Sequence, residues 1–284
     1  MPKPDHSRRN FVRAALGSGF AAAVLPVSAD AMKTDSNGLT VGEILIPIGD
    51  FKLPVYRAMP AGQRGLDKLP VVLVVSEIFG VHEYIADVAR RFAKLGYLAL
   101  APELFVRQGD AQSYGELSKL MEEVVSKVPD AQVMGDLDVC VAWANANGGD
   151  AARLAITGFC WGGRNVWLYA THNAAVKAAV AWYGQLMGAP TALKPSNPID
   201  LVGTLKAPVL GLYGGQDPSI PVSAVETMKA ALAASTNASA KKCELVVYPA
   251  AGHAFHADYR ASYEETSAQD GWKRCLAWFK ANGV

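Results

Sequence analysis

The sequence is poor in charge. Lys, Arg, Asp and Glu make up 19% of its 284 residues, and the formal net charge is +1. It has no basic stripe and no acidic tail, so we expect no nucleic-acid partner. Internal repeats and long low-complexity tracts are also absent. Hydrophobic residues make up 51%, and this length and composition suffice for one large α/β domain with a full core.

Cysteine is scarce, and its spacing excludes two common uses. The four cysteines include no C-x-x-C pair, which a thioredoxin-like redox motif or a zinc knuckle would need. Cys140 and Cys275 fall in helix-like stretches, where we expect small core residues. The sequence leaves a disulfide between any two cysteines open. His253 and His256 are three residues apart, but no third metal ligand is evident, so we expect no metal and no organic cofactor.

The sequence also lacks a hydrophobic run that would cross a bilayer comfortably, because the apolar stretch at 14–25 is too short. Before this stretch, Arg8 and Arg9 lie in a segment that resembles a twin-arginine export motif, and Ala29–Ala31 after it fits a small-x-small cleavage site. We expect a signal peptide that is removed in the periplasm, the twin-arginine machinery as a partner, and no stable membrane anchor. The alternative is a disordered basic arm before a short apolar helix.

The expected organisation is therefore a signal peptide at 1–31, a linker at 32–40 and one domain at 41–284, which we expect to be a monomer. Short apolar runs alternate with helix-like stretches along the domain. This alternation predicts a mostly parallel eight-stranded sheet with helices on both faces, beginning with a hairpin. The predicted strands are 41–48, 52–59, 71–76, 97–101, 153–158, 177–183, 208–214 and 244–249. The predicted helices are 84–95, 114–128, 132–147, 161–171, 221–234 and 260–281.

The segment Gly158–Gly163 joins a predicted strand to a predicted helix and carries Cys160 near its centre. A nucleophile on such a sharp turn has a strained backbone, and the glycines beside it avoid clashes. A thiol at a helix N-terminus also feels the positive end of the helix dipole, which favours the thiolate. The pattern predicts a nucleophile elbow with Cys160 as the nucleophile. The alternative is a glycine-rich turn that holds a buried cysteine.

Two further reactive residues follow the ends of predicted strands. Asp217 comes just after 208–214, and His253 comes just after 244–249. Ligands of open parallel sheets bind at the carboxyl ends of the strands, and nucleophile, acid, histidine is the chain order of such hydrolases. We predict that His253 takes the thiol proton and that Asp217 orients the imidazole. Taken alone, Asp217 could be a turn former and His253 a loop residue.

From about Val41 to the C-terminus, the chain resembles the dienelactone hydrolase family, the carboxymethylenebutenolidase-like, cysteine-dependent members of the α/β-hydrolase fold. The motifs that carry the resemblance are Ser76–Gly80, Gly96–Tyr97 with Ala101–Leu104, Gly158–Gly163, Gly214–Asp217 and Gly252–Phe255. The resemblance implies an α/β-hydrolase fold with Cys160, Asp217 and His253 as the triad.

The same resemblance implies three further roles near the nucleophile. Family members place a glutamate where Glu77 stands, which interacts with the thiol in the resting enzyme and releases it when substrate binds. The backbone N–H groups of Ile78 and Trp161 match the oxyanion hole, one from the loop after an early strand and one following the nucleophile.

The chain departs from the family pattern at two arginines that hold a substrate carboxylate. Ser118 and Ala257 stand at the matched positions, and Arg260 lies near the second. An anionic dienelactone is therefore in doubt as the substrate. Candidate substrate-binding residues are Phe79, Trp182, Tyr183 and Arg260.

We interpret the chain as an exported hydrolase that opens a carboxylic ester or lactone through an acyl-cysteine. The alternative within the same chemistry is a thioesterase or a general carboxylesterase. Alternatives of another class are a redox-sensing thiol protein and a non-catalytic binding protein on the same fold.

Overall fold

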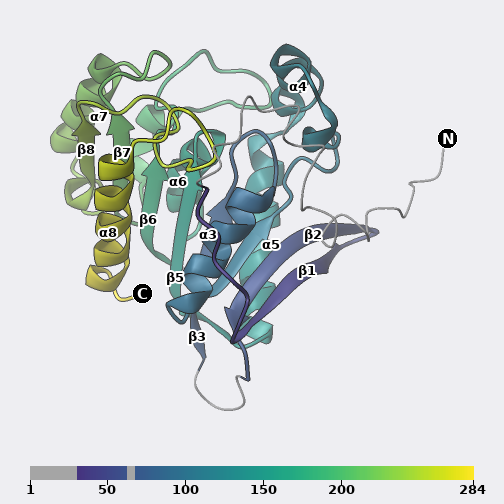
Figure 1. Cartoon of the computed structure of the whole chain (residues 1–284). Helices are drawn as coiled ribbons and strands as arrows, with labels where there is room; N and C mark the ends of the chain where they lie inside the picture. The colour runs from purple at the N-terminus through teal and green to yellow at the C-terminus, as the bar shows by residue number, and fades with distance from the viewer. Residues whose placement is uncertain (1–30, 63–67) are drawn as a thin grey trace.

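The computed structural model describes residues 31–62 and 68–284 (Figure 1). The predicted signal peptide lies, apart from its last residue, outside the described residues. Within the ranges that the structure describes, no helix is both long and apolar enough to cross a bilayer.

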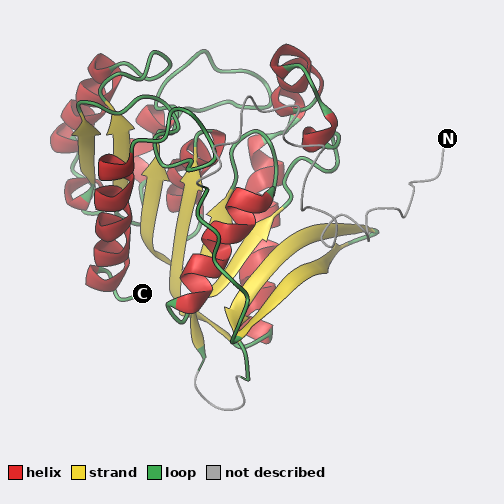
Figure 2. Ribbon diagram, in the orientation of Figure 1, coloured by secondary structure: helices red, strands yellow, loops and turns green. Residues whose placement is uncertain are grey.

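Eight strands form one sheet in the order β1-β2-β4-β3-β5-β6-β7-β8 (Figure 2). The hairpin β1-β2 is antiparallel and β2 is antiparallel to β4, whereas all the other neighbours are parallel. The predicted eight-stranded, mostly parallel sheet is confirmed. The strands are β1 (Leu39–Ile48), β2 (Phe51–Pro60), β3 (Leu69–Val75), β4 (Leu98–Pro102), β5 (Gly149–Phe159), β6 (Val176–Trp182), β7 (Val209–Gly214) and β8 (Glu244–Tyr248).

Helices cover both faces of this sheet. In Figure 1, α3 and α8 lie in front of the sheet, and α5 and α6 lie behind it. Because both faces are covered, the central strands are buried along almost their whole length and read as continuous apolar runs. The α-helices are α3 (Glu83–Lys94), α4 (Leu117–Glu123), α5 (Asp130–Ala146), α6 (Trp161–His172), α7 (Val222–Ala234) and α8 (Glu265–Ala281). The short 3₁₀ helices are η2 (Ala111–Ser113), η3 (Val125–Lys127), η4 (Pro198–Thr204) and η5 (Ala240–Lys242).

Two predicted helices are shorter in the structure. The predicted helix 114–128 is interrupted at Val124, whose backbone leaves the helical region, and continues as the 3₁₀ turn η3. The predicted helix 260–281 begins only at Glu265, because the Glu264 side chain accepts hydrogen bonds from the N–H groups of Thr266 and Ser267 and caps the helix there. Residues 249–264 are therefore a loop, and this loop carries His253.

The core confirms the expectation for two cysteines. Cys140 and Cys275 are fully buried, and burial raises the pKa of both thiols. Cys243 is partly buried, and burial raises the pKa of its thiol to about 11. All four cysteines of the chain are free thiols in the structure.

Candidate active site

The turn at Cys160 has the geometry of a nucleophile elbow. β5 ends at Phe159 and α6 begins at Trp161, so a single residue makes the connection. Cys160 has φ 54° and ψ −112°, a conformation that non-glycine residues rarely adopt. Its N–H donates to the carbonyl of Trp182 at 3.0 Å, which fixes the turn against the end of β6. The thiol is therefore held at the carboxyl end of the sheet.

Glycines make this turn possible because the backbone packs closely around it. A Cβ atom on Gly162 would lie 2.3 Å from the carbonyl oxygen of Val75. A Cβ atom on Gly163 would lie 2.5 Å from the carbonyl oxygen of Trp182. Both contacts are with backbone atoms, which cannot move aside as a flexible side chain could. Positions 162 and 163, next to the strained cysteine, therefore have room for glycine alone.

Asp217 and His253 meet at the same end of the sheet. The Nδ1 atom of His253 lies 2.6 Å from Oδ2 of Asp217. The other carboxylate oxygen accepts the backbone N–H groups of Ser219 at 2.8 Å and Ile220 at 3.1 Å. The aspartate is 5% exposed and is oriented from both sides. It can therefore fix the orientation of the imidazole, as an orienting acid must.

His253 also forms a hydrogen bond with Cys160. Burial of the ring opposes its charged form, but the hydrogen bonds to Asp217 and Cys160 and the charges of both groups outweigh it and raise the pKa of His253 to about 10. The arrangement favours a protonated imidazole ring at His253 beside the Cys160 side chain. The structure thus brings together the three side chains of the predicted triad.

Glu77 follows β3 and is 2% exposed. Its Oε2 atom lies 3.0 Å from Nε2 of His82, and the Tyr259 hydroxyl donates to its Oε1 atom at 3.4 Å. Among the described residues, the hydrogen bonds of Glu77 reach these two side chains and not Cys160. Control of the thiol by Glu77 stays a prediction.

The two predicted oxyanion donors flank the nucleophile in the fold. Trp161 is the first residue of α6, where the backbone N–H has no partner within the helix. Ile78 lies in the loop after β3, and within residues 31–62 and 68–284 its N–H donates to no protein acceptor. This loop is held by the Glu103 carboxylate, which accepts the N–H of Val81 at 2.8 Å.

The candidate substrate-binding residues lie in two different environments. Phe79 is partly exposed, and the Arg260 guanidinium lies 5.1 Å from the centre of its ring. Trp182 and Tyr183 are fully buried. The Trp182 indole donates to Thr157 inside the core at 3.0 Å.

Tyr183 lies beside the catalytic groups. Its ring centre is 5.2 Å from that of His253 in an edge-on arrangement. Burial, followed by the charges of Glu77 and Cys160 among others, raises the pKa of its hydroxyl well above the usual value. Tyr183 therefore lies near both of these acidic groups. Ser118, at one matched arginine position, is exposed on α4, and Ala257, at the other, is fully buried.

A cavity of about 260 Å³ adjoins the turn that holds Asp217. Its walls come from 185–187 after β6, from 219–221 before α7, and from the first turns of α7, and none of the lining side chains is charged. The lining residues of α7 are Ser223, Ala224 and Thr227. Ser219 and Ile220 line this cavity and also donate to Asp217. An uncharged cavity thus lies behind the turn that holds Asp217, and none of Cys160, Asp217 and His253 lines it.

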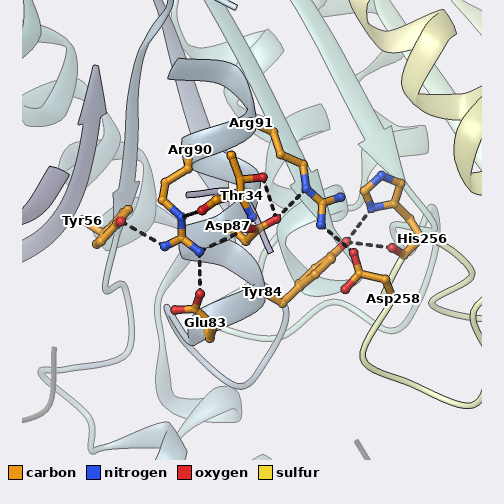
Figure 3. Close-up of polar contacts among 9 residues, drawn as sticks. All are labelled: Thr34, Tyr56, Glu83, Tyr84, Asp87, Arg90, Arg91, His256 and Asp258. Atoms are coloured by element: carbon orange, nitrogen blue, oxygen red, sulfur yellow. Dashed lines mark hydrogen bonds and ion pairs between the residues drawn. The ribbon is translucent and has the colours of Figure 1, made fainter. Parts of the chain in front are cut away.

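Helix α3 fixes the loop that carries His253 (Figure 3). The Arg91 guanidinium donates to Asp258 at 2.5 Å, and the Tyr84 hydroxyl lies 2.6 Å from Nδ1 of His256. Burial, reinforced by the charge of Arg91, lowers the pKa of His256 well below its usual value, so this ring is neutral. Its Nδ1 atom can therefore accept a hydrogen bond from the Tyr84 hydroxyl. Both contacts join α3 to the 249–264 loop.

The same helix also binds the segment before β1. The N–H of Thr34 donates to the buried carboxylate of Asp87 at 2.5 Å, and Arg90 donates to the carbonyl oxygen of Thr34 at 2.8 Å (Figure 3). Asp87 also accepts a hydrogen bond from Arg91 at 2.6 Å. Residues in the predicted linker at 32–40 are thus attached to α3.

Sequence reasoning did not assign His82 or Tyr259 to the site. His82 reads as a residue that starts a helix, and Tyr259 lies 182 positions after Glu77. Nothing local to either residue signals their meeting at Glu77. The described residues contain no group of three or more His, Cys, Asp or Glu side chains that could hold a metal ion.

The parallel sheet, the elbow after β5, and the acid and histidine after β7 and β8 together define an α/β-hydrolase. The chain belongs to the dienelactone hydrolase family, whose sequence profile matches residues 53–283. It is a carboxylic ester hydrolase.

Individual relatives agree with this assignment. The chain is 59% identical to a Methylorubrum extorquens protein named "Putative carboxymethylenebutenolidase", over 98% of this chain and 94% of the relative. An Escherichia coli protein of the same name is 53% identical, over 94% of this chain and 96% of the relative. The crystal structure of a "Putative Dienelactone Hydrolase" from Klebsiella pneumoniae is similar with a TM-score of 0.81 at 56% identity, covering 85% of this chain and 98% of that chain.

Proposed function

We propose that this enzyme hydrolyses an ester or lactone through an acyl-cysteine intermediate on Cys160. The observation that carries the proposal is the linked set of Asp217, His253 and Cys160, with the pKa of His253 raised to about 10 by these partners despite its burial. A thiolate beside an imidazolium is a strong nucleophile that needs no further activation.

In the first half of the reaction, the Cys160 sulfur attacks the carbonyl carbon of the substrate. The N–H groups of Ile78 and Trp161 hold the resulting oxyanion. As the C–O bond to the leaving group breaks, His253 gives its proton to the departing oxygen, and a thioester remains on the enzyme. In the second half, neutral His253 takes a proton from water, the hydroxide attacks the thioester, and the C–S bond breaks to regenerate the thiolate and the imidazolium.

The substrate class that we propose is a neutral or weakly charged ester or lactone. The names of the relatives point to lactones, and the cavity beside Asp217 is lined without charged side chains. The matched arginine positions support the same choice, because Ser118 and Ala257 carry no charge and cannot form an ion pair with a carboxylate. A thioester substrate would follow the same chemical steps.

The experiment is a hydrolysis screen over lactones, aryl esters and thioesters, with acid-quenched samples analysed by mass spectrometry. We expect an acyl adduct on Cys160 in the wild type and loss of most turnover in Cys160→Ala and in His253→Ala. The double variant should be little worse than either one, because members of a triad act as a unit. Cys243→Ala is the matched control and should keep its activity. Normal turnover by Cys160→Ala on every substrate would refute the nucleophile assignment.

The alternative of a redox-sensing thiol finds little support in the other cysteines. Burial raises the pKa of Cys140, Cys243 and Cys275, and a resolving thiol needs the opposite. Ester turnover that depends on Cys160 separates the two functions.

We also propose export by the twin-arginine route to the periplasm, on the sequence pattern around Arg8 and Arg9. Replacing both arginines by lysine should leave unprocessed protein in the cytoplasm, whereas the wild type should begin at about Met32. Cell fractionation followed by N-terminal sequencing checks this, and normal processing of the double-lysine variant would remove the proposal.

A further inference from the structure

Residues 33–38, called the 33–38 segment below, precede β1 and are attached to α3 at two places. In Figure 1 this segment belongs to the dark purple trace that crosses α3. The carbonyl oxygen of Thr34 accepts a hydrogen bond from Arg90 at 2.8 Å, and that of Asn37 accepts one from Lys94 at 2.8 Å. The two donors are four positions apart on the helix, which is about one turn. The backbone of the segment is therefore held along the surface of α3.

A buried carboxylate on α3, that of Asp87, lies between this segment and the loop that carries the catalytic histidine (Figure 3). Asp87 is 1% exposed, and its Oδ1 atom accepts the N–H of Thr34 at 2.5 Å and Arg90 at 3.1 Å. Its Oδ2 atom accepts Nε of Arg91 at 2.6 Å. The same guanidinium donates from its far side to Oδ2 of Asp258, in the 249–264 loop, at 2.5 Å. A continuous row of charge-assisted hydrogen bonds thus joins the segment to the loop.

The loop has a strained residue directly after the catalytic histidine. Ala254 has φ 61°, in the left-handed region that residues other than glycine rarely adopt, and it is 1% exposed. Such a conformation persists only where the surroundings hold it in place. Two contacts from α3 follow within four residues of Ala254: the Tyr84 hydroxyl at His256, at 2.6 Å, and the ion pair at Asp258. Contacts with α3 therefore hold the backbone that follows His253.

We propose that the 33–38 segment is a positioning element of the hydrolysis, which keeps His253 aligned for catalysis. It acts through Asp87 and Arg91, which connect it to the catalytic loop. This inference rests on the proposed function of the triad. From the sequence, the segment is part of a linker, whereas its contacts in the structure give it a role in the site. Cleavage at about Met32 would leave the whole segment on the mature enzyme.

The burial of Asp87 decides what the loss of the Thr34 N–H would do. A buried carboxylate that loses a donor is under-satisfied and moves toward the donors that remain, which here include Arg90 and Arg91. Because Arg91 also holds Asp258, a shift of its guanidinium is passed to the loop. A small misplacement of a catalytic group slows the chemical step more than it weakens substrate binding. The loss should therefore appear in kcat rather than in KM.

The test removes the N–H of Thr34. Thr34→Pro lacks this donor and also the hydroxyl, which contacts the same carboxylate at 3.4 Å. We expect kcat for p-nitrophenyl acetate to fall by about 2- to 30-fold, with KM changed by less than about twofold. Lys33→Pro is the matched control, because Lys33 is exposed and its N–H finds no acceptor among the described residues, so its kinetics should equal the wild type.

Hydrogen exchange, followed by mass spectrometry, reports the loop without depending on the triad. The N–H groups of Ala257 and Glu264 form hydrogen bonds within the loop, to the carbonyl oxygens of Ala254 and Phe255. Peptides that cover them should exchange faster in Thr34→Pro than in the wild type, and those of Lys33→Pro should not.

A double-mutant cycle with Arg91→Met tests the route of the effect. Because Thr34 acts through Arg91, the double variant should have about the same kcat as Arg91→Met alone. Losses that multiply would show that the two residues act independently, and this would overturn the proposed route.

The remaining outcomes are equally decisive. Melting temperatures verify folding at the temperature of the assay, and Lys94→Met, which removes the donor to Asn37, replaces Thr34→Pro if that variant does not fold. An unchanged kcat in the folded variant, with or without faster exchange, overturns the positioning role, as does a loss that Lys33→Pro reproduces. None of these results bears on the nucleophile, which Cys160→Ala tests separately by ester turnover.

Discussion

Asp217 binds His253 with one carboxylate oxygen and the backbone of its own turn with the other. The Nδ1···Oδ2 distance to His253 is 2.6 Å, and the N–H groups of Ser219 and Ile220 hold Oδ1 at 2.8 Å and 3.1 Å. The backbone of the turn therefore orients the Asp217 carboxylate independently of its contact with His253. Because Nδ1 faces the aspartate, Nε2 is the ring nitrogen available to Cys160. The imidazole is therefore already oriented for proton exchange with the thiol.

This relationship predicts the pH dependence of the enzyme. The pKa of His253 is raised to about 10, so the ring stays protonated through neutral pH. We expect kcat/KM to fall as the pH rises through about 10, where the leaving group loses its proton donor. In Asp217→Asn the pKa of His253 should drop, the fall should begin at lower pH, and kcat should decrease by about 10²- to 10⁴-fold.

The free energy of unfolding should also depend on the protonation of His253. The folded pKa of about 10 exceeds the ordinary value of 6.5, so the stabilisation from charged His253 is full below about 6.5 and is lost as the pH rises through about 10. Urea unfolding at pH 6 and pH 10 checks this, with His253→Gln as the comparison. The difference between wild type and variant should shrink at pH 10, and a constant difference would contradict the raised pKa.

The close packing around the elbow can be tested by substitutions outside the triad. In Gly162→Ala the new Cβ atom would meet the carbonyl oxygen of Val75 at 2.3 Å, so we expect a loss of about 3 kcal/mol or more in the free energy of unfolding. Gly135→Ala is the matched control. Gly135 lies exposed in α5 with no atom within 4 Å of the added Cβ, and alanine there should stabilise by about 0.5–1 kcal/mol. Chemical denaturation measures both, and equal stabilities would refute the packing argument.

The features that could be predicted from the sequence are those with a local cause. β3 and β6 are covered on both faces and therefore appear as apolar runs, and the elbow shows in the spacing of its glycines around Cys160. Asp217 and His253 could be placed because each comes directly after a strand, and parallel strands end at the same edge.

The features that escaped prediction depend on contacts between distant segments. His82 meets Glu77 close by in the sequence, but its burial depends on Tyr259, from a loop far along the chain. From the sequence, Trp182 is a candidate substrate-binding residue. Its side chain lies in the core and donates to Thr157, since successive residues of a strand face opposite sides of the sheet.

The ion pair between α3 and the catalytic loop predicts a second effect on stability. Arg91 lies between the buried carboxylates of Asp87 and Asp258, at 2.6 Å and 2.5 Å. Arg91→Met would leave both without this partner, and we expect a cost of about 3–5 kcal/mol in the free energy of unfolding. Because burial raises the pKa of Asp258, the cost should be smaller at acid pH, where its carboxyl group is neutral.

The matched control for this change is Arg274→Met. Arg274 contacts Asp270 at 2.6 Å, but both side chains are largely exposed, and such pairs contribute about 0–1 kcal/mol. Urea denaturation at pH 5 and pH 8 measures all three proteins. Similar costs for the two variants would show that the contact between α3 and the loop does not stabilise the fold.

Substrate charge is the last feature that the structure lets us predict. Ser118 is exposed on α4 and Ala257 is buried, and neither supplies a cation for a substrate carboxylate. A charge-assisted hydrogen bond contributes about 1.5–3 kcal/mol, and the absence of two should weaken an anionic substrate by about tenfold or much more. Arg260 is the cation nearest to Ala257 in the sequence. Its guanidinium lies 5.1 Å from the ring centre of Phe79. We expect kcat/KM to be higher for a neutral lactone than for a carboxylate-bearing dienelactone of similar size. Arg260→Ala should change that ratio little, whereas a strong preference for the anion that disappears in Arg260→Ala would show that Arg260 supplies the carboxylate site.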